Sequence, residues 1–210
     1  MNYFILELIG TVAFASSGAM IAIEKKMDIF GVNVLGATTA VGGGIMRDII
    51  LGLTPPGAFS HPVYVLVAAL TSTILFVIAY AKPTAFESRV KTDYYDKLMF
   101  WCDTAGLGIF TVVGIQAAVR AVGGENVFFF VFIGTLTGVG GGVLRDIMAG
   151  ETPYILVKHI YACAAIAGGI VCVVGRTAFG EAYGTILGLA ATVLLRFLAA
   201  HFRWNLMRVS

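Results

Sequence analysis

The chain has 210 residues, of which 59% are hydrophobic and only 12% are charged, and its mean hydropathy is +0.91. This composition excludes an ordinary soluble domain and is typical of an integral membrane protein. The net charge of +2 comes from basic residues scattered between apolar segments, so it gives no indication of a nucleic-acid partner. Membrane lipids are the expected partner.

Apolar stretches long enough to cross a membrane, roughly 20 residues each, follow one another along the chain. We place them at residues 3–23, 32–53, 61–81, 98–120, 126–149, 154–174 and 181–202. They are apolar on every side and about twice as long as a β-barrel strand, which predicts helices. The first stretch lacks the basic start of a cleavable signal and is expected to be retained. The predicted fold is an all-α membrane protein with seven transmembrane helices in one domain, residues 1–210.

The distribution of Lys and Arg predicts the orientation, because short cytoplasmic loops are enriched in both residues. One side would carry Lys25, Lys26, Lys82, Arg89, Lys91, Lys97, Lys158, Arg203 and Arg208, and the other side only Arg120 and Arg176. We therefore expect an inner-membrane protein of a prokaryote with its N-terminus outside and its C-terminus in the cytoplasm.

The segment VGGGIMRD at residues 41–48 recurs 98 residues later as VGGGVLRD at residues 139–146. The preceding helix recurs as well, since Glu7, Gly10, Phe14 and Gly18 correspond to Asp103, Gly106, Phe110 and Gly114. The repeat therefore spans three helices, residues 1–81 and 98–174. Because three is odd, the second copy enters the membrane from the opposite face, which predicts two inverted repeats. The helix at 181–202 stands outside them.

The glycine triplets, Gly42, Gly43 and Gly44 and then Gly140, Gly141 and Gly142, fall near the middle of the second and fifth predicted helices. Glycine is unfavourable in a helix interior, so each triplet predicts a kink or an unwound turn. Unwound backbone at this depth is tolerated only inside the protein or beside water, and in inverted-repeat proteins it indicates a substrate or ion pathway. Close helix packing is the alternative interpretation of the glycines.

Charged residues follow each triplet: Arg47 and Asp48, then Arg145 and Asp146. An arginine in hydrocarbon costs a few kcal/mol or more, so both should face the interior, water or a partner. Adjacent residues on a helix point in different directions, and the expected partners therefore lie on other helices. We predict the pairs Arg47 with Glu7 and Arg145 with Asp103.

The pattern resembles the TRIC family of trimeric intracellular cation channels, in particular its prokaryotic members, which are similar to glycine-transporter-like membrane proteins. The resemblance rests on GGGIMRD and GGGVLRD, on the following GLTP and GETP, and on the FASSGA and DTAGLGIFTVVG helices, and it covers nearly the whole chain. It implies a homotrimer with one pore per subunit, kinked second and fifth helices lining that pore, and permeability to potassium.

Carbonyl oxygens freed at the glycine triplets would be neutral ligands for potassium or another monovalent cation. Hydroxyls can add to such a path, although each can also bond to its own helix; the candidates are Ser16, Ser17, Thr38, Thr39, Thr135 and Thr137. The arginines oppose cation entry, so we expect them, with Asp48, Asp146, Glu7 and Asp103, to act as a gate or latch.

Other classes of function have little support. No phosphate loop or HExxH motif is present, and the histidines lie near segment ends, so we predict no enzyme activity, no cofactor and no metal site. A structural assembly factor would need longer loops or tails. A secondary transporter for a small amino acid such as glycine is the main alternative, because inverted repeats with broken helices are also transporter anatomy.

Overall fold

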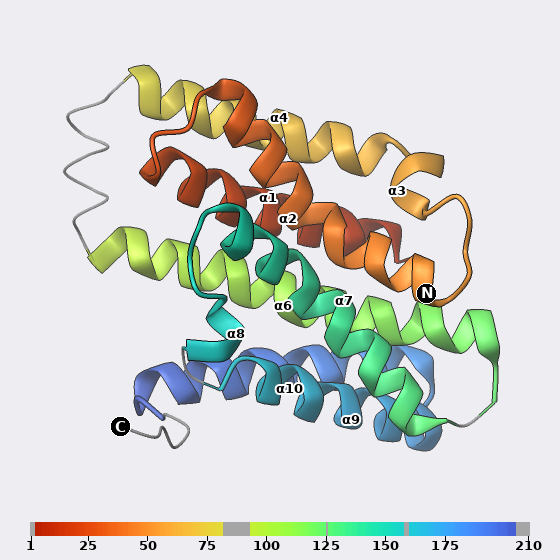
Figure 1. Ribbon diagram of the computed structural model, residues 1–210. Helices are drawn as coiled ribbons and strands as arrows, with labels where there is room; N and C mark the ends of the chain where they lie inside the picture. Colours follow the sequence, from red (N-terminus) through yellow and green to blue (C-terminus); the bar gives the residue numbers. More distant parts are fainter. Residues whose placement is uncertain (1–2, 82–92, 125, 158–159, 205–210) are drawn as a thin grey trace.

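The computed structural model describes residues 3–81, 93–124, 126–157 and 160–204, and within them the chain is helical without a β-strand. The helices are α1 (Phe4–Glu24), α2 (Ile29–Ile50), α3 (Gly57–Ser60), α4 (Val63–Ala81), α6 (Asp93–Val122), α7 (Val127–Met148), α8 (Tyr154–Val157), α9 (Ala162–Phe179) and α10 (Glu181–His201). All but the short α3 and α8 are long and apolar enough to cross a membrane, which makes seven spans among the described residues. Figure 1 shows them as one elongated bundle.

Side-chain caps and glycines mark the two ends of α2 and of α7. The Asp28 side chain accepts a hydrogen bond from the Gly31 backbone N–H at 2.8 Å, and Asn126 does the same for Phe129 at 3.0 Å, so α2 and α7 both start at a capped turn. Past their ends, Gly52 and Gly150 have φ of 69° and 71°, a left-handed conformation that glycine adopts without strain.

The predicted spans differ from the observed helices mainly at one place. We expected a span over 154–174, whereas residues 154–157 form the separate helix α8 and the span begins at Ala162. The Asp146 side chain contributes to this difference, because it accepts a hydrogen bond from the backbone N–H of Tyr154, the first residue of α8, at 2.7 Å. Several basic residues used to predict the orientation lie outside the described residues, namely Lys82, Arg89, Lys91, Lys158 and Arg208.

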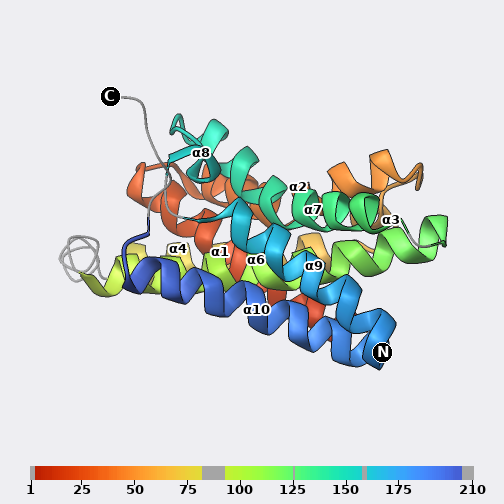
Figure 2. The same ribbon diagram turned by 90° about the horizontal axis from the view of Figure 1, so that it is seen from below.

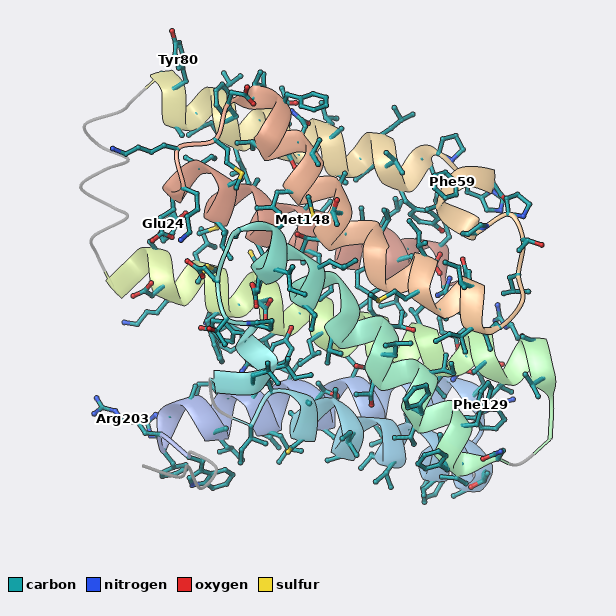
Figure 3. All side chains as sticks on the ribbon, in the orientation of Figure 1. Glu24, Phe59, Tyr80, Phe129, Met148 and Arg203 are labelled. Atoms are coloured by element: carbon teal, nitrogen blue, oxygen red, sulfur yellow. The ribbon has the colours of Figure 1, made fainter. Side chains whose placement is uncertain are left out.

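The bundle has two ends. The short helix α3 lies at one end together with the start of α1, and α8 lies toward the other, where α10 ends (Figure 1). Figure 3 places Phe59 at the first end and Glu24 and Arg203 at the second. We call these the α3 end and the α8 end.

Helices α2 and α7 pack against each other, and Figure 2 shows them together on one side of the bundle with α10 on the other. Helix α1 packs against α2, and α6 against α7, so that each of the two central helices has its own neighbour. Helix α10 packs chiefly against α9 and also contacts α6. The glycine triplets lie within the two central helices.

Of the two conformations predicted at the glycine triplets, the unwound turn is wrong, and a kink in a continuous helix stays a prediction. Helix α2 is continuous through Gly42–Gly44 and α7 through Gly140–Gly142. The reason is the distance between the two helices: a Cβ atom on Gly43 would lie 2.1 Å from the Thr137 carbonyl oxygen, and one on Gly141 would lie 2.0 Å from that of Thr39. The glycines allow two continuous helices to cross with their backbones in contact.

Candidate functional site

The crossing of α2 and α7 is reciprocal. Gly43 faces Thr137, and Gly141 faces Thr39, so each helix presents to the other the residue at the matching place in the repeated motif. The third glycine of each triplet has a different neighbourhood. A Cβ on Gly44 would meet only Arg47, at 3.8 Å, and one on Gly142 would lie 3.3 Å from the Tyr161 hydroxyl. Two glycines of each triplet therefore serve the crossing, and the third borders the charged residues.

Arg145 is the centre of a buried charged cluster toward the α8 end. Its guanidinium is 2% exposed and contacts the Asp103 carboxylate of α6 at 2.8 Å. The same guanidinium also pairs with Asp146 at 2.8 Å and donates a hydrogen bond to the Ser17 hydroxyl of α1. The predicted pair of Arg145 with Asp103 is therefore present. Three helices meet at one guanidinium.

Asp146 links this cluster to the chain that follows α7. One of its carboxylate oxygens accepts from Arg145 Nε at 2.8 Å, and the other accepts from the Tyr154 backbone N–H at 2.7 Å. A buried carboxylate with both oxygens hydrogen-bonded is well satisfied, whereas an unpaired one would cost several kcal/mol. Asp146 thus fixes the start of α8 relative to Arg145.

A second buried arginine, which the sequence analysis missed, completes the cluster. Arg196 of α10 is 1% exposed, and its Nη2 lies 3.7 Å from Asp103 Oδ2. Its guanidinium lies over the rings of Phe100 and Tyr161, at 4.9 and 4.7 Å from their centroids. The available signal was simple: Arg196 is the one Lys, Arg, Asp or Glu within residues 182–200. We call Ser17, Asp103, Arg145, Asp146, Tyr161 and Arg196 the α8-end cluster.

Tyr161 precedes α9 and lies fully inside the protein. Burial, and then the Asp103 carboxylate beside it, raise the pKa of the Tyr161 hydroxyl well above its ordinary value. The hydroxyl therefore remains protonated and uncharged next to the charged groups. Only about 10 Å³ of empty space remains beside the cluster, bordered by Met99, Asp103 and Arg196 among others.

The matching residues of the first repeat border a real cavity. It has a volume of about 170 Å³, and its lining includes Glu7, Arg47, Asp48, His61 and Tyr64. At this α3-end cavity the formal charges of Glu7, Arg47 and Asp48 sum to −1, since one positive group faces two carboxylates. The two ends thus differ: one charged site is open and the other is closed.

Arg47 is neutralised by its own neighbour, which corrects the predicted partner. Its Nε contacts Asp48 Oδ1 at 2.7 Å, and no salt bridge joins it to Glu7, although both residues are described and line the same cavity. The long arginine side chain bends back to reach Asp48. The Glu7 carboxylate instead accepts a hydrogen bond from the Tyr64 hydroxyl of α4. Asp48 also accepts from the Gly57 backbone N–H at 2.8 Å, as Asp146 does from Tyr154.

Two phenylalanines separate the charged sites. The rings of Phe14 on α1 and Phe110 on α6 lie 5.3 Å apart, and both are buried. Along α1, Phe14 lies between Glu7, which lines the cavity, and Ser17, which contacts Arg145. Phe110 forms part of the cavity wall. Phe14 and Phe110 also occupy matching positions in the sequence repeat, so each half contributes one ring to this apolar layer.

Three of the six predicted hydroxyls bond to their own helices. Ser16, Thr39 and Thr137 each donate to the carbonyl oxygen four residues earlier, at 2.7, 2.6 and 2.6 Å. Thr135 borders an apolar groove between α7 and α9, and Thr38 is half-buried on α2. Of the six candidates, Ser17 is the one that the structure brings to a charged site. Ser16, Thr39 and Thr137 bond back to their own helices, as serine and threonine commonly do in apolar helices, whereas the buried Thr135 hydroxyl has no hydrogen-bond partner among the described residues.

The sequence of this chain matches one family model and several known membrane proteins. The family model described as "Glycine transporter" matches residues 4–80 and 100–177. The UPF0126 inner membrane protein YadS of Escherichia coli K12 is 37% identical over 208 residues, which cover 98% of this chain and 94% of YadS. The UPF0126 membrane protein YvgT of Bacillus subtilis is 32% identical, covering 98% of this chain and 96% of YvgT.

Solved structures of TRIC channels superpose on all or nearly all of the chain. A chain from a study of conductance through TRIC cation channels has a TM-score of 0.83 and 36% identity, covering 100% of this chain and 98% of that one. The TRIC trimeric intracellular cation channel orthologue from Rhodobacter sphaeroides has a TM-score of 0.84 and 32% identity, covering 96% and 98%. The chain therefore belongs to the family that the glycine transporter model and the UPF0126 relatives define, and this is the family of the prokaryotic TRIC channels, which are not enzymes.

Proposed function

We propose that this protein is a channel for monovalent cations, potassium among them, with one conduction path inside each subunit. The path runs from the α3-end cavity, past Phe14 and Phe110, to the α8-end cluster. It lies among α1, α2, α6 and α7. The kinship with TRIC cation channels supports conduction of cations.

The observation that carries the proposal is the pair of matching charged sites on either side of one apolar layer. Buried charges in a membrane protein are expensive, and they are concentrated where ions or protons move. Here, the sites occur at both ends of one line through the subunit, with the 170 Å³ cavity at one of them. A layer of two phenylalanine rings between polar sites acts as a barrier by excluding water.

The sign of the charge favours cations at the open end. With Arg47 paired to Asp48 at 2.7 Å, the Glu7 carboxylate is the group left to attract an ion, moderated by the Tyr64 hydroxyl. The freed carbonyls that the glycine triplets would have offered are not available in this structure, because both helices are continuous. Carboxylate oxygens, rather than backbone oxygens, are therefore the proposed cation ligands.

The α8-end cluster is the proposed gate. Arg145 joins Ser17, Asp103 and Asp146, so a movement of α1, α6 or α7 must rearrange these contacts. We propose that the cluster switches between two arrangements, one closed with its ion pairs made and one open with its groups hydrated. Arg47 and Asp48 are the equivalent latch at the α3 end.

The repeat and the relatives support a proposal for the wider assembly. The reciprocal contacts of Gly43 and Gly141 support two inverted repeats, residues 1–81 and 98–174, related by an axis between α2 and α7, with residues 181–202 as the seventh span. We propose a homotrimer, in line with the trimeric orthologue, and an orientation with the α3 end outside and the α8 end in the cytoplasm.

Purified protein in liposomes tests the proposal. With an outward potassium gradient and no organic substrate, potassium should leave the vesicles, and bilayer recordings should show discrete current steps. The name of the family model makes glycine uptake the alternative, and Arg47 beside the cavity is the group that would hold its carboxylate. Accumulation of radiolabelled glycine without potassium flux would overturn the channel proposal.

A further inference from the structure

We infer that Arg196 is a tethered cation that closes the α8 end by occupying the position beside Asp103 where a permeating cation would pass. This inference rests on the proposed function as a cation channel and assigns the closing group within it. It assigns a function in channel closure to α10, the helix outside the two repeats.

The contacts of Arg196 are those of a cation in a binding site. A carboxylate oxygen lies at 3.7 Å and two aromatic faces lie within 4.9 Å of the guanidinium carbon. A carboxylate together with aromatic faces is a favourable environment for any monovalent cation. The α8-end cluster holds two arginines and two aspartates, so it is formally neutral with Arg196 present and has a charge of −1 without it.

The hydrogen bonding of the Arg196 guanidinium is incomplete. None of its three guanidinium nitrogens has a hydrogen-bond partner, and neither Asp103 Oδ2 nor the Tyr161 hydroxyl has one. A buried guanidinium normally satisfies several of its five N–H groups, and each unmet donor or acceptor is unfavourable. The adjacent space of about 10 Å³ has room for about one water molecule. Opening of the α8 end would admit more water, and that water would supply these atoms with the hydrogen-bond partners that they lack.

The other end of the subunit has no such group. Glu7 matches Asp103 and Tyr64 faces Glu7, but the described lining of the α3-end cavity contains no second arginine. That end retains about 170 Å³ of space, compared with about 10 Å³ at the α8 end. The inserted guanidinium of α10 accounts for the difference between the two matching sites.

Charge-removing and charge-retaining variants test the inference. Arg196→Gln and Arg196→Met should raise potassium flux into liposomes about tenfold, the change expected when the closed state loses one favoured interaction. Arg196→Lys should stay close to the wild type. Arg176→Gln is the matched control, because Arg176 borders a separate cavity between α6, α7 and α9, and its flux should be unchanged.

A second readout does not depend on conduction. Met99 borders the small space beside Arg196. In a background without the three native cysteines, the substitution Met99→Cys reports water access through its rate of reaction with a charged thiol reagent. Arg196→Gln should increase that rate about tenfold, and Arg196→Lys should not.

The outcomes separate the two proposals. If no potassium flux is found in any variant, the channel proposal fails, and the thiol reaction still decides whether Arg196 closes this end. Equal thiol reaction rates and equal flux for folded Arg196→Gln and wild-type protein would overturn the inference. So would a loss of flux in Arg196→Gln and Arg196→Met together with an unchanged thiol rate, because Arg196 would then serve only to hold α10 in place.

Discussion

Substituting one glycine of the triplet, and then its neighbour, tests the helix crossing. A Cβ atom on Gly43 would lie 2.1 Å from the backbone carbonyl oxygen of Thr137, whereas carbon and oxygen normally approach no closer than about 3.3 Å. Gly43→Ala therefore requires α2 and α7 to separate by about 1.2 Å. The obstacle is backbone, so no side-chain rotation can relieve it.

The expected magnitude follows from two opposing effects. Overpacking a close contact costs about 1–3 kcal/mol, and this contact belongs at the upper limit, while Ala in a helix interior is about 1 kcal/mol better than Gly. Gly43→Ala should thus destabilise the fold by about 2 kcal/mol, which lowers the melting temperature by about 4–8 °C in a chain of this size. Gly44→Ala meets only Arg47 at 3.8 Å, and it should be neutral or slightly stabilising.

The assay is the thermal unfolding of both variants in the same detergent, followed by the loss of the folded peak in size-exclusion chromatography. Gly141→Ala should behave like Gly43→Ala, because its Cβ would lie 2.0 Å from the Thr39 carbonyl oxygen. Equal melting temperatures for the Gly43→Ala and Gly44→Ala variants would show that the triplet does not set the distance between the helices.

Two further predictions concern the charged sites. Asp146→Ala leaves the buried Arg145 guanidinium with one carboxylate fewer and frees the Tyr154 backbone N–H, so the folded yield should fall sharply, as for a loss of about 3–5 kcal/mol; a normal yield would show that this ion pair is dispensable. Tyr64→Phe removes the hydroxyl that donates to Glu7, so potassium flux in liposomes should rise while the melting temperature changes little; a fall in flux would contradict the proposed role of Glu7 as a cation ligand.

The seven spans could be predicted because lipid leaves the backbone no alternative to internal hydrogen bonding. The pair of Arg145 with Asp103 could be predicted as well, since the sequence repeat and the cost of a buried charge both point to it. The backbone conformation at the glycine triplets could not be predicted. Helix propensity describes one isolated helix, whereas here two helices meet at Gly43 and Gly141, and their close contact goes together with continuous helices.

Two features of the site could not be predicted from the sequence, for another reason. Adjacent residues on a helix diverge at Cβ, yet the Arg47 side chain is long enough to reach Asp48, and Glu7 turns to Tyr64 instead. Nothing in the repeat indicates that Arg196, on a helix outside it, inserts beside Asp103. Such contacts depend on how helices distant in the sequence pack against one another.

The most direct test of the conduction path is chemical block inside the α3-end cavity. Val41 lines that cavity, so Val41→Cys in a background without native cysteines places a reactive thiol on the proposed path. Modification with a positively charged thiol reagent during bilayer recording should reduce the potassium current, because the added charge repels the permeating ion. A current that stays unchanged after mass spectrometry has shown complete modification of Val41→Cys would contradict a path through this cavity.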